Sequence, residues 1–249
     1  MALTHIHSGL GIGTSPRSFI DRGINTTIVE LDPIVHDFAT KYFDLPPNHT
    51  AILSDAVDYV SRTSLTAPHS FDYIVHDVFT GGAEPTALFT LEFLQGLEKL
   101  LKEDGVVAIN YAGDITLPPP RIVLSTIHAV FPTCRIFRDS EPDPQSADPI
   151  HFINMVVFCT KSSTRPLTFR RPTEDDWGAS LSRREFVPPS SKLEIKLGDI
   201  VKASGGEGRK DVILKKGNEA LIEQFHKDHA VRHWELMRTV LPDAVWETW

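Results

Sequence analysis

The chain has 249 residues, of which 41% are hydrophobic and 23% are charged. This composition is typical of a globular protein and excludes a disordered or fibrous chain. Acidic residues outnumber basic ones by 33 to 25, and residues 1–160 alone carry 19 acidic and 9 basic side chains. Because an acidic surface repels phosphate backbones, nucleic acid is not expected as a partner. The acidity would attract a cationic substrate, although an acidic surface more often only confers solubility.

The length of the apolar runs bears on the location of the chain. None approaches the roughly 18 residues of a membrane-spanning helix, so no span is expected here. The first residues lack the basic and apolar regions of a secretory signal, which favours a cytoplasmic location. Cys134 and Cys159 are the two cysteines. They are too few for a disulfide framework or a cysteine zinc site, and we expect two ordinary buried thiols.

Short apolar runs alternate with longer periodic segments over residues 1–161, which is typical of an α/β fold. The predicted strands, in chain order, are residues 4–8, 26–31, 50–54, 71–77, 105–111, 135–138 and 152–160. The predicted helices lie between them, at residues 15–22, 33–43, 55–62, 90–101 and 122–131. We therefore predict a Rossmann-like, mostly parallel, seven-stranded sheet that forms a nucleoside-binding domain over residues 1–161.

The remaining residues, 162–249, are predicted to form a C-terminal extension of loop and helix. Residues 162–217 are rich in Pro, Ser, Gly and charge, with short strands predicted at 193–197 and 211–215. Residues 218–240 form one amphipathic helix in this prediction, followed by Pro242 and the aromatic residues Trp246 and Trp249. Because large aromatic side chains are rarely left in water, the tail is expected to dock on the domain or on a second subunit of a homodimer.

A glycine-rich segment, GLGIG at residues 9–13, follows the first predicted strand and precedes the first predicted helix. Gly9, Gly11 and Gly13 would let the backbone turn sharply and approach a ligand closely at a helix N-terminus. The spacing differs from the dinucleotide fingerprint because Ser15, not a further glycine, follows Gly13. A tight turn without a ligand is the alternative interpretation.

Acidic residues follow the next three predicted strands. Glu30 and Asp32 end the second strand, roughly 20 residues after the glycines, where a carboxylate can accept both hydroxyls of a ribose. Asp55 and Ala56 follow the third strand, where the carboxylate can accept from an adenine amino group, and Asp77 ends the fourth. Because the carboxyl ends of parallel strands meet at one edge of the sheet, these residues predict a nucleoside site there.

Residues 4–161 resemble the S-adenosylmethionine-binding core of class I methyltransferases, and more closely the spermidine/spermine synthase branch of that fold. The branch-specific features are VELDP at 29–33, Asp55-Ala56, and DVFTGGAEP at 77–85 leading through Leu88-Phe89 into a helix. The resemblance implies that Glu30 holds the ribose and Asp55 the adenine. It also implies that Asp77 deprotonates an attacking amine.

Three departures from that family concern the polyamine part of the site. Ile12 stands where the glycine loop of true aminopropyltransferases carries an aspartate, and Thr80 stands where their second strand-end aspartate would be. The small N-terminal β-domain that covers their polyamine groove is expected to be missing, since this sequence starts at the first core strand. The departures put spermidine synthesis in doubt and leave the nucleoside site intact.

Other candidate residues have two interpretations each. His226, His229 and His233 would share one helical face and could bind zinc, but no Cys or Glu clearly completes the set. A solvated face is therefore expected and no metal is predicted. Tyr111 and Thr80 are candidate substrate residues, with Tyr111 equally compatible with a packing aromatic. His76 is expected to be a packed core residue, with electrostatic tuning of Asp77 as the alternative.

The predicted function is transfer of a group from a sulfonium nucleoside to an amine-like acceptor, either a small molecule or a protein. The cofactor would be S-adenosylmethionine, its decarboxylated form, or methylthioadenosine as a product. A neutral nitrogen would attack the carbon bonded to the sulfonium, and Asp77 would take the proton. Methyl transfer is favoured over aminopropyl transfer. A non-catalytic nucleoside-binding or scaffold protein is the alternative from another class.

Overall fold

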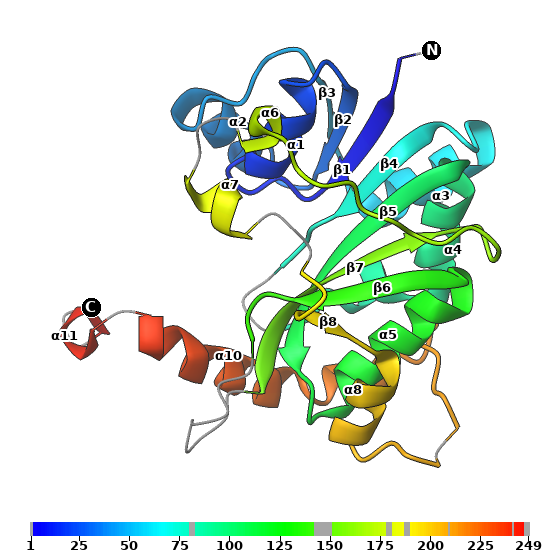
Figure 1. Cartoon of the computed structure of the whole chain (residues 1–249), viewed down its shortest axis with the longest axis vertical. Coiled ribbons are helices and arrows are strands. Elements are labelled where there is room, and N and C mark those ends of the chain that lie inside the picture. Colours follow the sequence, from blue (N-terminus) through cyan, green and yellow to red (C-terminus); the bar gives the residue numbers. More distant parts are fainter. Residues whose placement is uncertain are drawn as a thin grey trace.

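The computed structural model describes residues 2–79, 83–141, 151–177, 181–186, 190–208, 210–240 and 242–246. In these residues the centre of the molecule is an eight-stranded sheet in the order β3-β2-β1-β4-β5-β7-β6-β8 (Figure 1). The strands are β1 Thr4–Ser8, β2 Asn25–Glu30, β3 Thr50–Leu53, β4 Phe71–His76, β5 Leu101–Asp114, β6 Thr133–Arg138, β7 Phe152–Thr160 and β8 Glu194–Ile195. Strands β1 to β5 pair in parallel, whereas β7 is antiparallel to both β5 and β6.

The helices confirm the predicted alternation with the strands. In chain order they are α1 Thr14–Ile20, α2 Pro33–Tyr42, α3 Ala56–Thr66, the 3₁₀ helix η1 Thr86–Phe89, α4 Leu91–Leu100, α5 Pro118–Val130, α6 Glu174–Trp177, α7 Leu181–Phe186, α8 Leu197–Ala203, α9 Ala220–Glu223, α10 His226–Val240 and α11 Asp243–Trp246. Helix α4 buries Leu94 and Leu100 completely. The predicted Rossmann-like, mostly parallel fold is confirmed.

The sheet differs from the prediction in three details. It has an eighth strand, β8, which falls inside the predicted strand 193–197 and pairs antiparallel with β6. The other strand predicted in that region, 211–215, is not formed among its described residues. Strand β5 starts at Leu101, earlier than the predicted 105, because Leu101 already pairs with Phe71 across an irregularity in the β4 register.

The order of the strands reverses at β1, which lies between β2 and β4. From β1 the chain passes through α1 to β2 and through α2 to β3 at the edge of the sheet. Helix α3 then returns the chain to β4, on the other side of β1. Open α/β sheets bind ligands at the carboxyl ends of the strands beside such a switch point, because the helices leave in opposite directions and open a crevice there.

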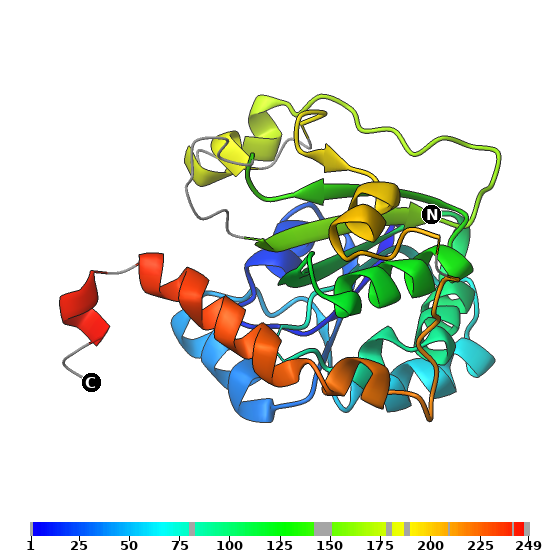
Figure 2. The ribbon, with the colours of Figure 1, turned by 90° about the horizontal axis from the view of Figure 1, so that it is seen from below.

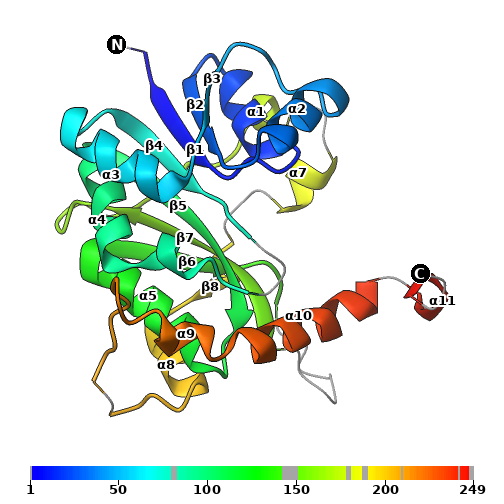
Figure 3. The same cartoon turned by 180° about the vertical axis from the view of Figure 1, so that it is seen from behind.

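Helices cover both faces of the sheet. Helices α3, α4 and α5 pack in a row on one face (Figure 3) and enclose the larger hydrophobic core. Helices α1 and α2 pack on the other face, over a small separate core of Leu10, Ile20, Ile28, Ala39 and Leu45. Two of its members, Leu10 and Leu45, belong to loops, so this core also fixes the position of the glycine-rich segment.

The segment after β7 is built into the fold. The ring of Phe169 lies 5.0 Å from Phe158 and 5.5 Å from Phe137, so residues 162–177 cross the face of β6 and β7. Arg135 on β6 forms a two-pronged ion pair with Glu194 on β8, at 3.0 and 2.8 Å. Further along, α8 packs on α5 and buries Ile200.

The tail is two helices, which corrects the single helix predicted over residues 218–240. Helix α9 buries Ile222 beside α5, and the chain then turns at residues 224–225 before α10 begins. The first turns of α10 contact β5 and β7, and the helix then extends away from the sheet (Figure 2), where Trp234 is 47% exposed.

Several expectations for the tail concern residues outside the part that the structure describes. The side chains of Trp246 and Trp249 are among these, so their predicted docking stays a prediction. Across the described ranges, no helix has the length and apolar character needed to cross a membrane.

Cys134 and Cys159 form a disulfide, which corrects the expectation of two free thiols. They lie directly opposite each other on the antiparallel strands β6 and β7, with 4.2 Å between their Cα atoms. Facing residues of antiparallel strands bring their Cβ atoms within bonding range of two sulfurs. The sequence does not reveal this pairing because it depends on the strand register.

Candidate active site

A cavity of about 1140 Å³ opens at the carboxyl ends of β1, β2, β3 and β4. Its wall on one side, here named the loop side, consists of Gly9, Gly11, Glu30, Asp55 and their neighbours. The opposite wall, named the helix side, consists of residues 84–88 together with Glu219, which precedes α9, Ala220 and Glu223 from α9, and His226 from α10. Asp77 lines the same cavity, from a strand that lies between β1 and β5.

The glycine-rich segment turns sharply against the end of β4. Gly9 has a φ of +82°, and a Cβ atom at this position would lie 2.3 Å from the backbone oxygen of Asp77. Only glycine fits a backbone that is both left-handed and this close to another chain segment. Gly11 also lines the cavity. Gly13 lies outside the lining, where it precedes α1 and packs against Leu45.

Glu30 ties the glycine-rich segment to the end of β2. Its Oε2 accepts a hydrogen bond from the Leu10 backbone N–H at 2.8 Å, and its Oε1 accepts from the Asp32 N–H at 2.9 Å. A carboxylate has about four acceptor positions. Two therefore remain on Glu30 for a ligand in the cavity.

The two other predicted acids on the loop side cap helices. Asp32 accepts from the Ile34 N–H at 2.8 Å at the start of α2, and it does not line the cavity. Asp55 accepts from the Val57 N–H at 2.6 Å at the start of α3, and it does line the cavity, as does Ala56. N-caps satisfy free amide groups of the first helical turn, so both acids have a local structural task.

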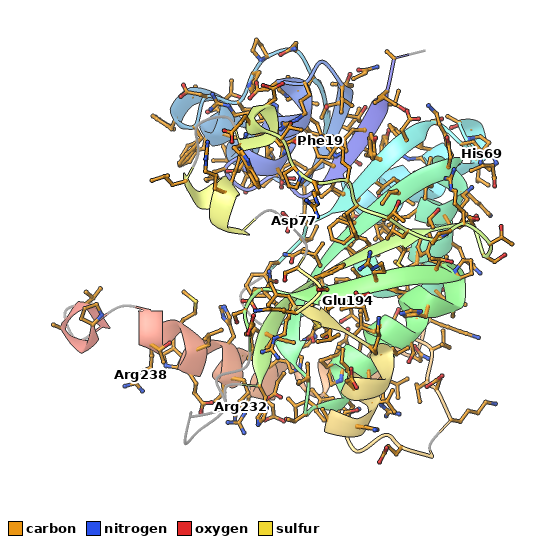
Figure 4. The ribbon with its side chains drawn as sticks, viewed as in Figure 1. Phe19, His69, Asp77, Glu194, Arg232 and Arg238 are labelled. Carbon is orange, nitrogen blue, oxygen red and sulfur yellow. A yellow bond between two sulfur atoms is a disulfide. The ribbon has the colours of Figure 1, made fainter. Side chains whose placement is uncertain are left out.

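Asp77 follows β4 directly and is exposed to the cavity (Figure 4). Its Oδ1 accepts a hydrogen bond from the side-chain amide of Asn110 at 2.9 Å. Asn110 stands on β5 next to Ile109, whose partner across the ladder is His76. Sequence analysis did not single out Asn110, because its role depends on the β4–β5 register.

Three buried histidines lie under this end of the sheet. Burial lowers the pKa of His5 to about 3 and that of His7 to about 4, although Asp77 acts on His7 in the opposite direction. Burial also lowers the pKa of His76 to about 4, and the His76 ring packs against Phe89 and Phe93. All three imidazoles are therefore neutral at neutral pH, and His76 is a packed residue as expected.

The helix side contains a buried polar cluster that the sequence did not predict. Tyr111 donates a hydrogen bond to Oε1 of Glu84 at 3.0 Å, and Nδ1 of His229 lies 2.6 Å from the same oxygen. The side chain of Glu84 is 4% exposed and that of His229 is completely buried. Burial and the neighbouring Glu84 raise the pKa of Tyr111 above its usual range, so Tyr111 stays a neutral donor.

The three tail histidines face the domain rather than solvent, which corrects the predicted solvated face. His229 contacts Glu84, and His233 packs its ring 5.1 Å from Phe79. His226 lines the cavity. Within the described ranges, no three His, Cys, Asp or Glu side chains gather in a way that could hold a metal ion. Thr80, a candidate substrate residue, lies outside the described residues.

The charge of the cavity wall has one sign. Six carboxylates line it, and among the described lining residues there is no lysine or arginine; the six are Glu30, Asp55, Asp77, Glu84, Glu219 and Glu223. Low-dielectric walls focus the field of such charges into the space between them. The cavity therefore attracts cationic ligands such as sulfonium and ammonium groups.

Comparisons with known proteins agree with this geometry. Residues 23–134 match the spermine/spermidine synthase domain. The chain carries a spermine/spermidine synthase-like domain. A polyamine aminopropyltransferase from Vibrio vulnificus is 35% identical over 106 residues, which cover 41% of this chain and 35% of that protein.

A longer match is to the N-terminal histidine N-methyltransferase of Emericella nidulans. It is 48% identical over 243 residues, which cover 97% of this chain and 43% of that protein. The chain thus spans less than half the length of this relative.

Solved structures share the fold. A probable spermidine synthase from Corynebacterium glutamicum superposes with a TM-score of 0.62 at 20% identity, covering 86% of this chain and 74% of that chain. Human methyltransferase-like protein 13, solved with SAH, gives a TM-score of 0.53 at 22% identity, covering 74% of this chain and 89% of that chain. Both establish the Rossmann-like methyltransferase fold.

Proposed function

We propose that this chain is an S-adenosylmethionine-dependent N-methyltransferase whose acceptor is the N-terminal histidine of a protein. The observation that carries the proposal is the cavity, where Asp77 and the loop-side residues lie at one sheet edge. The activity named for the Emericella nidulans relative, 48% identical over 97% of this chain, supports the choice of acceptor.

The residues of the loop side suit S-adenosylmethionine. Glu30 would accept the ribose hydroxyls with its remaining lone pairs, and Asp55 the adenine amino group, with Ala56 beside it. Gly9 and Gly11 would let the ligand approach the backbone closely. Gly13 and Asp32, outside the lining, would support the loop and helix that shape this side. The acidic wall suits the positive sulfonium.

The bound cofactor would supply a methyl group activated by the sulfonium. The chain's own contribution is to hold an acceptor nitrogen in line with that methyl group, which removes much of the entropic barrier. As the unprotonated imidazole nitrogen forms its bond to the methyl carbon, the carbon–sulfur bond breaks, and the other ring nitrogen loses its proton so that the methylated ring is neutral. Asp77 would accept this proton, and the amide of Asn110 would hold the carboxylate in place.

Aminopropyl transfer from decarboxylated S-adenosylmethionine is the second candidate. One observation favours it, because no lysine or arginine is among the described lining residues to pair with the carboxylate of the intact cofactor. Another observation weighs against it. Ile12, which stands at the family's aspartate position, is outside the cavity lining and 53% exposed, so this polyamine-binding group is lost.

The test incubates the full chain with S-adenosylmethionine and two peptides that differ only at the first residue, His or Ala. Mass spectrometry should show one added methyl group on the histidine peptide alone. The variant Asp77→Asn is the matched control and should give no product above background.

A second reaction, with decarboxylated S-adenosylmethionine and putrescine, separates the two candidates. Turnover of putrescine with no methylation of either peptide would contradict the proposal in favour of aminopropyl transfer. No turnover in either reaction would leave the chain as a binding protein.

A further inference from the structure

The carboxylate of Glu84 is only half satisfied by the protein. Its Oε1 receives the hydroxyl of Tyr111 and lies 2.6 Å from Nδ1 of His229. Its Oε2 is buried, and it accepts no hydrogen bond from any described residue. The nearest candidate partner is Nε2 of His226, at 3.8 Å, beyond hydrogen-bond range.

A buried carboxylate oxygen without a donor is expensive, because the charged group has given up its hydration. Structures retain such an oxygen where a ligand or ion completes it. Arg232, a cationic side chain of α10, lies 3.5 Å from Asp114 on β5 and 3.0 Å from Glu235, so it is engaged with other carboxylates. We therefore expect the partner of Oε2 to be a cationic ligand that enters through the cavity, rather than Arg232.

Glu84 faces the space into which an acceptor must enter. It lines the same cavity as Asp77, on the side formed by residues 84–88, α9 and α10. Tyr111 donates a hydrogen bond to the carboxylate and His229 contacts it, so its Oε1 is engaged before a ligand arrives. His226 stands at the first position of α10, directly after the turn at residues 224–225, and its side chain is 30% exposed.

We propose that Oε2 of Glu84 binds the α-ammonium group of the acceptor's N-terminal residue, in the place that His226 approaches in the free protein. This subsite deepens the proposed function and rests on it. An N-terminal histidine carries two nitrogen groups, an ammonium and an imidazole. Glu84 would hold the ammonium, while Asp77 would accept the proton that the imidazole ring releases.

The experiment combines a change in the protein with a change in the acceptor. The full chain and Glu84→Gln are each assayed with a peptide that begins with histidine and with its des-amino analogue, which begins with imidazolepropionyl and lacks only the α-amine. The wild type should prefer the amine-bearing peptide by about tenfold or more in kcat/KM, the scale of a hydrogen bond to a charged group. In Glu84→Gln this preference should fall to below about threefold.

Two further variants separate the subsite from a general effect of charge. Glu223→Gln removes a carboxylate from the same cavity wall, where Glu223 is exposed, and should keep the preference for the amine. His226→Ala uncovers Oε2 and should keep it as well. Loss of the preference in His226→Ala with its retention in Glu84→Gln would assign the ammonium to His226 and overturn the proposal.

A binding measurement makes the test independent of turnover and of folding. Calorimetry of the two peptides on the protein loaded with S-adenosylhomocysteine should give the same ratio as the kinetics, and thermal unfolding reports whether Glu84→Gln is folded. A wild type that methylates both peptides equally well would overturn the subsite while leaving the proposed function standing. A wild type that neither methylates nor binds the histidine peptide would overturn the proposed function itself.

Discussion

The two sides of the cavity are assembled in different ways. On the loop side, each important residue lies at the end of a strand or within two residues after it, as Gly9, Glu30 and Asp55 do. On the helix side, Glu84 comes from a connecting segment, Tyr111 from β5 and His229 from the tail helix. The first side is a series of short local motifs, and the second exists only when distant segments of the folded chain meet.

This difference separates the two parts of the proposed reaction. The loop side repeats a strand-end arrangement that the fold provides for nucleosides at its switch point. The helix side depends instead on individual side chains of this chain, because Tyr111 and His229 contact the buried carboxylate of Glu84. In the proposed reaction, nucleoside binding would thus be a property of the fold, and the choice of acceptor would be a property of the tail and of the segment around Glu84.

The largest effect is expected at Asp77, which lies between the two sides. Asp77→Asn keeps the shape of the side chain and removes its ability to accept a proton, so methyl transfer should fall by about a hundredfold or more. Binding of S-adenosylmethionine, measured by calorimetry, should remain near the wild-type value. Activity that stays within about threefold of wild type would show that another group accepts the proton.

A substitution at Gly9 should damage the loop side through the backbone. Gly9→Ala places a Cβ atom 2.3 Å from the Asp77 backbone oxygen at a φ of +82°. The strain and the clash together should cost about 3 kcal/mol of unfolding free energy. Gly11→Ala is the control for the clash alone, because Gly11 also has a positive φ, of +54°, but a Cβ atom there meets nothing within 4 Å. Denaturant unfolding of both variants checks the prediction, which fails if Gly11→Ala is the more harmful.

Two acids of the loop side should separate ligand binding from helix capping. Glu30→Ala should weaken S-adenosylmethionine or methylthioadenosine binding by about 1–3 kcal/mol, the scale for hydrogen bonds to a charged group. Asp32→Ala removes the cap of α2 and should cost about 1 kcal/mol of stability with little change in affinity. Equal losses of affinity in the two variants would contradict the distinction.

A smaller effect concerns the buried histidines under the site. An unfolded histidine titrates near 6.5, whereas the folded pKa of His5 is about 3, so the unfolded chain binds more protons between these values. Stability should therefore be lost as the pH falls below 6.5. His5→Phe should remove up to about 1.4 kcal/mol per pH unit of this slope. Denaturant unfolding between pH 6.5 and 4.5 measures it, and an unchanged slope in the variant would contradict the assignment.

Much of the fold and half of the cavity could be predicted from the sequence. The seven predicted strands exist, and Gly9, Glu30, Asp55 and Asp77 all reach the cavity. They were predictable because a strand and the residue after it are contiguous in the chain. Once these strands pair in parallel, their carboxyl ends lie at the same edge of the sheet, and the residues at those ends come together there.

The rest depends on contacts that local patterns do not encode. The pairing of Asn110 with Asp77 and the disulfide of Cys134 and Cys159 both depend on strand register. The contact between Glu84 and His229 joins a connecting segment to the tail helix, which lie far apart in the sequence. The spacing of the histidines on α10 could be read from the sequence. That this face packs against the domain could not, because an amphipathic pattern does not specify which segment covers it.

The most direct test of the account is a calorimetric titration of S-adenosylmethionine into the wild type, Glu30→Ala and Glu84→Gln. The account predicts one saturable site in the wild type, a loss of about fivefold or more in Glu30→Ala, and an affinity within about twofold of wild type in Glu84→Gln. No binding to the wild type, or an equal loss in both variants, would contradict the division of the cavity into a nucleoside side and an acceptor side.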